Sequence, residues 1–383
     1  MIEQGRISGL DGLRGVAVSL VIITHAAELT EFPVAAFPLL ERIVGLGWTG
    51  VDLFFAISGF LITTLLMREE RANELASGVL RFDLRAFYLR RALRILPPYL
   101  FVVVVLLSVV GTFDFVGCAR AAHEIAGVSP SLFIFLATFT SNYGFALRVV
   151  PLGAGMAYVA LWSLCVEEHF YAGWSLLLTF VKSARFRLIC IVGVCVVSPL
   201  LRWQASVHEF PLLLKIETHL RLDAILCGAG VALAFPFVAK HVKARRALLI
   251  ALLMTLLAFG RDMHAEETTR AGFAIGFSVL TSLCALVVGE AAASPQSPFC
   301  RILAIAPLRK LGEVSYGMYL LHIPLIDMVK GLLLRIPMAN LGAHFVLSTI
   351  CYIGLTYLAA RLMFRFVERP FLIHKSRLSR GLN

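Results

Sequence analysis

The chain is poor in charged residues, which make up 15% of its 383 positions, whereas soluble domains carry about 25%. Hydrophobic residues make up 59% of the sequence, and its mean hydropathy is +0.85. These values predict an all-α, polytopic helical membrane protein rather than a soluble domain. No linker, repeat or low-complexity segment interrupts the sequence, so we expect residues 1–383 to form a single membrane domain without a C-terminal soluble domain.

Several catalytic and metal-binding signatures are also missing. The sequence has no G-x-x-x-x-G-K phosphate loop, no H-E-x-x-H zinc helix and no G-x-S-x-G nucleophile elbow. Its eight cysteines include no C-x-x-C pair, which argues against a disulfide framework and against a zinc site. An ATP-driven pump, a zinc protease and a serine hydrolase with that elbow are therefore disfavoured, and we expect neither a metal nor a bound cofactor.

The sequence does carry an excess of positive charge, with a formal net charge of +11. The basic residues lie in loops between apolar runs, which orientation in a bilayer explains better than a nucleic-acid partner. Ten apolar runs approach the length needed to cross a membrane. They lie near residues 10–29, 47–67, 95–111, 157–181, 188–203, 222–238, 246–260, 271–290, 313–335 and 344–366.

The positive-inside rule predicts how these runs are oriented. Four segments are rich in lysine and arginine: 68–94, 182–187, 239–246 and the tail 365–380. All four face the cytoplasm only if an eleventh apolar run, 131–147, does not cross. We therefore expect 131–147 to be re-entrant or interfacial, with Arg148 outside. The result is about ten transmembrane helices with both termini in the cytoplasm.

Arg14 and His25 are ionisable residues inside the otherwise apolar first run. A charge at membrane depth costs about 2.5–3.5 kcal/mol on insertion scales, so such residues indicate a functional site. Eleven residues turn a helix through about 1100°, close to three full turns, so both side chains share one face about 16 Å apart. If Arg14 lies at a membrane surface, His25 lies near the midplane. The alternative is a snorkelling arginine and a histidine bonded to a neighbouring helix.

Arg91 and Arg94 precede a run that opens with Pro97 and Pro98. They are three residues apart and are therefore neighbours on a helix surface. Two guanidiniums in this arrangement could bind phosphates in a bidentate manner. Positive-inside charge explains a basic loop equally well, and the sequence leaves both interpretations open.

Glu167, Glu168 and His169 are consecutive ionisable residues in the apolar run 161–174. They point about 100° apart on a helix and cannot all face lipid, so we expect at least one to be functional. In the ten-span topology this helix enters from outside and brings Glu167 to about the depth of His25. We therefore expect the Glu167 carboxylate beside His25, where it would fix the tautomer and raise the basicity of the imidazole.

Two other polar pairs lie at or in later spans. Arg221 and Asp223 stand at a span entrance, where an ion pair that holds helix ends is the simpler interpretation. Ser315 and His322 are seven residues apart, which places them two turns apart on one helix face. For His322, a buried and hydrogen-bonded role is at least as good an interpretation as a catalytic one.

Two further segments favour a structural interpretation. Ser58 and Gly59, in the run 50–66, are small residues of the kind that permits close contact between membrane helices. The segment 366–371, FVERPF, is a charged terminus of the last span.

These runs, taken in order, resemble the acyltransferase 3 family of integral membrane O-acyltransferases. The resemblance covers nearly the whole chain and rests on an ordered set of segments: LDGLRGVAVSLVIITH, GVDLFFAISGFLIT, FYLRRALRILPPY, WSLCVEEHFY, RLDAILCG, SYGMYLLHIP and VERPF. The Arg-x10-His motif of the family falls on Arg14 and His25, and its Arg-x-x-Arg motif on Arg91 and Arg94. Its Ser-Leu-x-x-Glu-x-x-Phe-Tyr motif falls on Ser163, Leu164, Glu167, Phe170 and Tyr171. The family often has glutamine where this chain has His169.

The resemblance implies transfer of an acyl group, in the first place acetyl, from acetyl-CoA or another acyl-CoA. The acceptor it implies is a hydroxyl of a glycan, a lipid-linked saccharide or a similar molecule, and the expected location is the bacterial inner membrane. A histidine with a pKa near 6.5 is a suitable general base for such a transfer. We therefore expect His25 to be catalytic with Glu167 as its partner. The expected donor-binding residues are Arg14, Arg91 and Arg94. The candidates for acceptor binding or support are Ser163, Tyr171, Arg221, Asp223 and His322.

A proton-coupled secondary transporter is the alternative from a different functional class, because a buried histidine and glutamate can relay protons. Inverted repeats would favour a transporter, and the sequence shows no corresponding halves. Cleavage of acetyl-CoA by membranes that contain the protein would favour the transferase.

Overall fold

The structure is a computed structural model that describes residues 8–29, 33–34, 37–110, 130–147, 149, 160–206, 216–259, 269–333 and 340–373. Every regular element in these ranges is a helix. Five helices are long and apolar enough to cross a membrane by length and composition. The prediction of an all-helical polytopic membrane protein is confirmed.

Ten helices of the described chain overlap the ten expected spans. They are α1 (Ser8–Ala26), α3 (Thr49–Ser77), α4 (Leu84–Val110), α9 (Trp162–Phe180), α10 (Ala184–Ala205), α12 (Thr218–Leu233), α14 (Val242–Phe259), α15 (Phe277–Ala293), α18 (Ser315–Leu333) and α19 (Leu341–Met363). Two of them continue as π-helices: η6 (Gly272–Gly276) leads into α15, and η7 (Phe364–Glu368) follows α19. Short helices connect the long ones: η1 (Ala27–Leu29), α2 (Pro38–Gly45), α13 (Phe235–Lys240), α16 (Pro298–Leu303) and α17 (Ala306–Glu313).

The ambiguous run 131–147 forms two short helices, α6 (Pro130–Ala137) and α7 (Ser141–Ala146). They have eight and six residues, so at 1.5 Å per residue each is about 12 Å long or less. Neither can cross a hydrocarbon core of about 30 Å, as expected for a re-entrant or interfacial segment. Arg148 lies outside the described residues.

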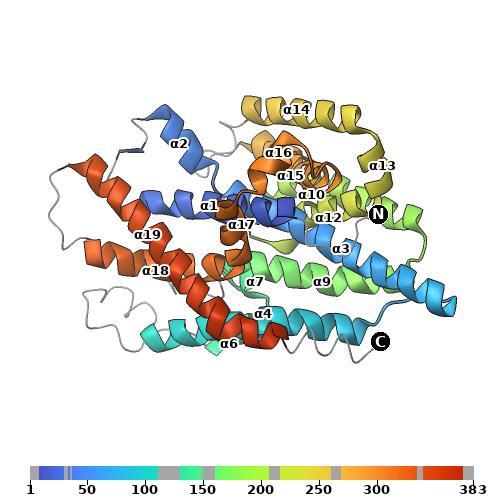
Figure 1. Ribbon diagram of the computed structural model, residues 1–383, viewed down its shortest axis with the longest axis horizontal. Helices are drawn as coiled ribbons and strands as arrows, with labels where there is room; N and C mark the ends of the chain where they lie inside the picture. The colour runs from blue at the N-terminus through green and yellow to red at the C-terminus, as the bar shows by residue number, and fades with distance from the viewer. Residues whose placement is uncertain are drawn as a thin grey trace.

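The basic connections gather at one end of the bundle. Near the end of α3, both carboxylate oxygens of Glu70 accept hydrogen bonds from the Arg187 guanidinium at 2.8 Å. Glu70 also forms an ion pair with Lys182. These contacts join the end of α3 to the connection between α9 and α10. In Figure 1 the α3–α4 and α9–α10 connections lie at the same, right-hand end of the long helices. This arrangement places basic segments on one side, as the positive-inside rule requires.

Glycines allow α3 to pack closely against α12, and α1 to pack closely against α16 and α17. A Cβ atom on Gly59 of α3 would stand 1.9 Å from the Ile225 carbonyl oxygen of α12. On α1, a Cβ on Gly12 or Gly15 would stand about as close, 2.0 and 2.1 Å, to carbonyl oxygens of Leu303 and Leu308. The packing prediction for Gly59 therefore agrees with the structure. Gly12 and Gly15 lie on the face of α1 that packs against α16 and α17. Arg14 points from another face of the helix and lines a cavity.

Candidate active site

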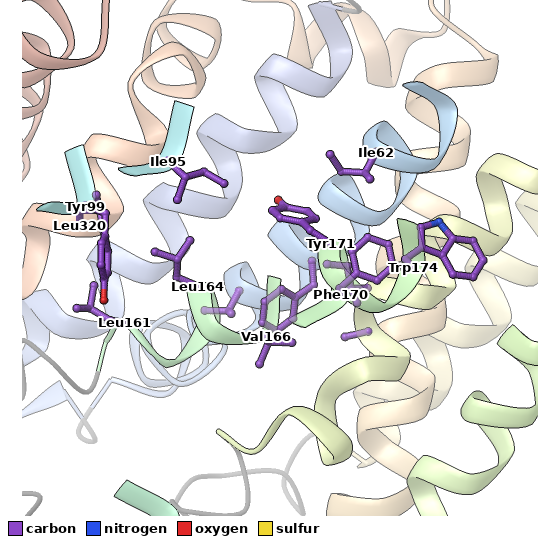
Figure 2. Close-up of a cluster of buried hydrophobic side chains, with 14 of the residues drawn as sticks. Ile62, Ile95, Tyr99, Leu161, Leu164, Val166, Phe170, Tyr171, Trp174 and Leu320 are labelled. Atoms are coloured by element: carbon purple, nitrogen blue, oxygen red, sulfur yellow. The ribbon is translucent and has the colours of Figure 1, made fainter. Parts of the chain in front are cut away.

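A cavity of about 300 Å³ lies between α1, α3, α4, α9 and α18. Its polar lining comes from all five helices. Six predicted site residues belong to it: Arg14, Arg91, Arg94, Ser163, Glu167 and Tyr171. The other polar residues of the lining are Ser58, Ser315, Tyr316 and Tyr319. Figure 2 shows part of its apolar wall, where Leu164 and Tyr171 point from α9 toward Ile95 of α4 and Ile62 of α3. We call this space the inner cavity.

A second cavity of about 540 Å³, which we call the vestibule, adjoins the inner cavity. Six residues line both spaces: Arg14, Leu61, Leu65, Arg94, Ser315 and Tyr316. The charged residues that line only the vestibule are Asp11, Arg68, Glu313 and Glu368. Arg68 belongs to the basic segment 68–94, so the vestibule faces the basic end of the bundle. The two cavities therefore form one path from that end toward the bundle centre.

Three arginines converge where the two cavities meet. Arg14 comes from the first helix and Arg91 and Arg94 from the first turns of α4, so residues nearly eighty positions apart in the chain share one space. Arg14 and Arg94 line both cavities, and Arg91 lines the inner one. The Arg91 guanidinium lies over the Phe87 ring at 5.9 Å, which holds it by a cation–π contact. The expected donor-binding residues are thus brought together.

Glu167 is the carboxylate of this arginine cluster. Its Oε1 accepts a hydrogen bond from Ser58 and its Oε2 accepts one from Tyr171, both at 2.8 Å. Its charge interacts with Arg14 and Arg94. Ser58 therefore makes a polar contact, in addition to the helix packing that the sequence favoured. Ser58 precedes Gly59, which contacts α12, and its hydroxyl therefore lies on a different face of α3, the face toward Glu167 of α9.

The predicted pair of Glu167 and His25 does not form. Both carboxylate oxygens are bonded to hydroxyls at the level of Arg14, whereas His25 lies eleven residues, about 16 Å, further along α1. Residue spacing gives the distance between two side chains along one helix, but it does not give the position of α9 relative to α1 along the membrane normal. The sequence therefore could not fix the height of Glu167 relative to His25. In the described structure the Glu167 carboxylate bonds Ser58 and Tyr171 rather than the imidazole.

His25 instead packs against His322 of α18. The ring centroids are 4.9 Å apart in an edge-on arrangement with an interplanar angle of 71°. The Nδ1 of His25 is 2.8 Å from the Val21 carbonyl oxygen, and the Nδ1 of His322 bonds the Tyr319 carbonyl oxygen. A carbonyl can only accept a hydrogen bond, so each Nδ1 carries a proton, and in the neutral form of either ring the lone pair lies at Nε2. His25 is partly accessible, whereas His322 is 1% exposed.

Tyr319 connects the histidine pair to the inner cavity. Its ring lines the cavity and lies 5.2 Å, centroid to centroid, from His322. Its hydroxyl accepts a hydrogen bond from Ser163 at 2.8 Å and donates one to the Ala160 carbonyl oxygen at 3.0 Å. Ser163, which the sequence offered as a support residue, therefore holds the residue next to the histidines.

Arg221 and Asp223 each form an ion pair, but with residues of other helices rather than with each other. Arg221 binds Asp52 of α3 at 2.7 Å, and Asp223 binds Arg202 of α10 at 2.8 Å. All four side chains are 3% exposed or less, and neither member of the predicted pair is among the residues that line the two cavities. Residues two apart on a helix do not face each other, so each reaches a different neighbouring helix. These ion pairs join α12 to α3 and to α10.

Two further residues depart from the sequence interpretation. Glu368, in the segment interpreted as a structural terminus, lines the vestibule and is 7% exposed. Sequence reasoning missed it because a charged residue at the end of an apolar span has an ordinary structural explanation. His169 bonds the Thr218 hydroxyl through Nδ1 at 2.7 Å, and it is not among the residues that line either cavity.

The comparison with known families decides what this arrangement belongs to. The acyltransferase domain family matches residues 7–365, nearly the whole chain. The chain belongs to the acyltransferase 3 family. Its members in this comparison include the peptidoglycan O-acetyltransferase OatA of Listeria monocytogenes, which is 26% identical over 379 residues that cover 95% of this chain and 55% of that protein.

Two other relatives have similar coverage. A Staphylococcus aureus (strain COL) protein named "Putative O-acetyltransferase" is 30% identical over 387 residues, 95% of this chain and 57% of its own length. The Bacillus subtilis "Putative peptidoglycan O-acetyltransferase YrhL" is 27% identical over 384 residues, 95% of this chain and 54% of its own length. The chain thus spans about half the length of the curated relatives it matches. No solved structure matches it.

Proposed function

We propose that this chain is a membrane O-acyltransferase that moves an acetyl group from acetyl-CoA to a hydroxyl of a cell-envelope polysaccharide. The observation that carries the proposal is the convergence of Arg14, Arg91 and Arg94 on a path that leads from the basic end of the bundle toward the histidine pair. An acyl-CoA has the matching form, because it is anionic at one end and reactive at the other.

The arginine cluster supports binding of the phosphates of the donor. Arginine presents a planar fork of donors that suits phosphate oxygens, and charge-assisted hydrogen bonds of this kind are roughly twice as strong as neutral ones. Glu167 lines the same cavity as these arginines, and Ser58 and Tyr171 fix its carboxylate. The thioester end of the donor would then extend along the inner cavity toward Tyr319.

The chemistry needs a base near the far end of that cavity. As an acceptor hydroxyl attacks the thioester carbonyl, it must lose its proton, and the departing CoA thiolate must gain one. His25 has its lone pair at Nε2 and is partly accessible, so it would take the proton from the hydroxyl and return it to the thiolate. General catalysis of this kind contributes about 10²–10⁴-fold to a rate.

The polysaccharide acceptor rests on the relatives. One is a peptidoglycan O-acetyltransferase by name, and we extend its class of acceptor, a hydroxyl of a wall polysaccharide, to this chain. The proposed orientation places both termini and the vestibule in the cytoplasm, where acyl-CoA is found, and the acceptor on the other side.

A direct test measures release of CoA thiol from acetyl-CoA by membranes that contain the chain. Membranes with Arg94→Ala protein at the same expression level are the matched control. The proposal predicts thiol release that depends on the chain and on Arg94, with label from [acetyl-¹⁴C]acetyl-CoA appearing in polysaccharide. Proton-coupled transport without thiol release would instead support the transporter alternative, whose buried histidine and glutamate would relay protons.

A further inference from the structure

The inner cavity changes character along its length. Its open end, shared with the vestibule, carries Arg14 and Arg94. Apart from Ile62, the residues that line only the inner cavity on α3 and α18 lie further along these helices from the vestibule, at Val51 to Ser58 and at Tyr319 and Leu320. This deep end is built mainly from aromatic and aliphatic side chains. A donor with its phosphates at the arginines therefore places its acyl group at the deep end.

Tyr319 lies at the deep end of the inner cavity. Its hydroxyl forms hydrogen bonds with the Ser163 hydroxyl and the Ala160 carbonyl oxygen, and we call these three groups the clasp. The phenol accepts from the first at 2.8 Å and donates to the second at 3.0 Å. Its ring also lies edge-on to Phe54 of α3, with centroids 6.1 Å apart. The side chain is thus fixed by α3, by the start of α9 and by its own helix.

Tyr319 borders both the inner cavity and His322. Tyr319 lines the cavity on one side, and on the other its ring is 5.2 Å from the ring of His322, whose Nδ1 bonds the Tyr319 main-chain oxygen. An acyl carbon at the deep end therefore lies next to the histidine pair, and further acyl carbons would have to occupy the space that the phenol fills. A partly buried aromatic ring whose hydroxyl both donates and accepts a hydrogen bond does not yield this space without loss of those bonds.

We propose that Tyr319 is the residue that sets acyl chain length, and that the clasp restricts this chain to short acyl groups such as acetyl. The inference rests on the proposed function, because it assumes that an acyl-CoA enters with its thioester foremost. It goes beyond that function by naming the class of acyl group and the side chain that selects it.

The test uses the full chain in membranes and compares kcat/KM for acetyl-CoA with that for butyryl-CoA, measured as CoA thiol release. One or two extra methylenes in a closed apolar pocket change such a ratio by about tenfold or more. We expect the wild-type chain to prefer acetyl-CoA by at least about tenfold, and Tyr319→Ala to lower this preference by about tenfold. Tyr319→Phe keeps the ring and loses only the two hydrogen bonds, so it should fold and shift the preference in the same direction by less.

Tyr316→Phe is the matched control. Tyr316 is one turn earlier on α18, lines both cavities and donates its hydroxyl to the Ile95 carbonyl oxygen at 3.1 Å. We expect this variant to keep the acetyl-to-butyryl ratio of the wild-type chain, whatever its overall rate. Equal use of the two donors by the wild-type chain, or an unchanged ratio in folded Tyr319→Phe and Tyr319→Ala proteins, overturns the inference. A wild-type chain that consumes neither donor overturns the proposed function itself, and the inference falls with it.

Discussion

Replacement of Arg94 by alanine separates donor binding from membrane orientation as the reason for the basic segment 68–94. Arg94 stands where the vestibule meets the inner cavity, so the account assigns it to the phosphates of the donor. A lost charge-assisted hydrogen bond costs about 1.5–3 kcal/mol, and each 1.4 kcal/mol is a factor of ten in affinity. We therefore expect the KM for acetyl-CoA to rise by about 10- to 150-fold, with a smaller rise for Arg94→Lys, which keeps the charge but loses the fork.

Arg90→Ala provides the control for this prediction. Arg90 is on the same helix and carries the same charge, but its guanidinium binds Glu69 at 2.6 Å, and it is absent from the lining of both cavities. The pair is about one-fifth exposed on each side. Both variants remove one positive charge from the same end of α4, so an effect through orientation would be common to them. Steady-state kinetics on membranes with matched protein levels would measure it. An equal change of KM in the two variants, or none in Arg94→Ala, would refute a donor-binding role.

Two further predictions concern packing and topology. Gly59→Ala should lower the thermal unfolding midpoint in detergent, because its Cβ would lie 1.9 Å from the Ile225 carbonyl oxygen and overpacking costs about 1–3 kcal/mol; Gly173→Ala, which meets nothing within 4 Å, should leave the midpoint unchanged. Single cysteines in 68–94 of a cysteine-free chain should react with impermeant reagents only from the cytoplasm, and one at position 148 only from outside. Labelling of position 148 from inside would contradict the ten-span topology.

The elements of the fold were largely predictable, because apolar run length in a membrane protein is a strong signal. The division of the run 131–147 into two short helices, α6 and α7, was not predicted from the sequence. The helix boundaries were less accurate: α3 extends to Ser77, ten residues beyond its apolar run. The charged last turns of α3 project past the apolar stretch, where Glu70 and its basic partners hold them.

Six of the ten predicted site residues line the inner cavity, but the contacts between them could not be predicted from the sequence. Arg14, Arg91 and Arg94 were grouped through the family resemblance, since spacing alone could not bring α1 and α4 together. Glu167 was assigned to the wrong partner because a sequence gives depth only along a single helix. Ser58 was assigned to packing because a hydroxyl next to a glycine contact looks, in sequence, like another small residue.

The His25 side chain is the centre of the account, and its removal provides the most direct test. In the His25→Ala chain, acetyl transfer from acetyl-CoA to membrane polysaccharide should fall by at least about 100-fold, while the Kd for acetyl-CoA should stay at the wild-type value, because the arginine cluster lies about 16 Å away along α1. Both quantities can be measured on the same purified protein, with the thermal midpoint as the check on folding. Folded His25→Ala protein that still transfers acetyl groups at a rate close to the wild type would contradict the assignment of His25 as the base.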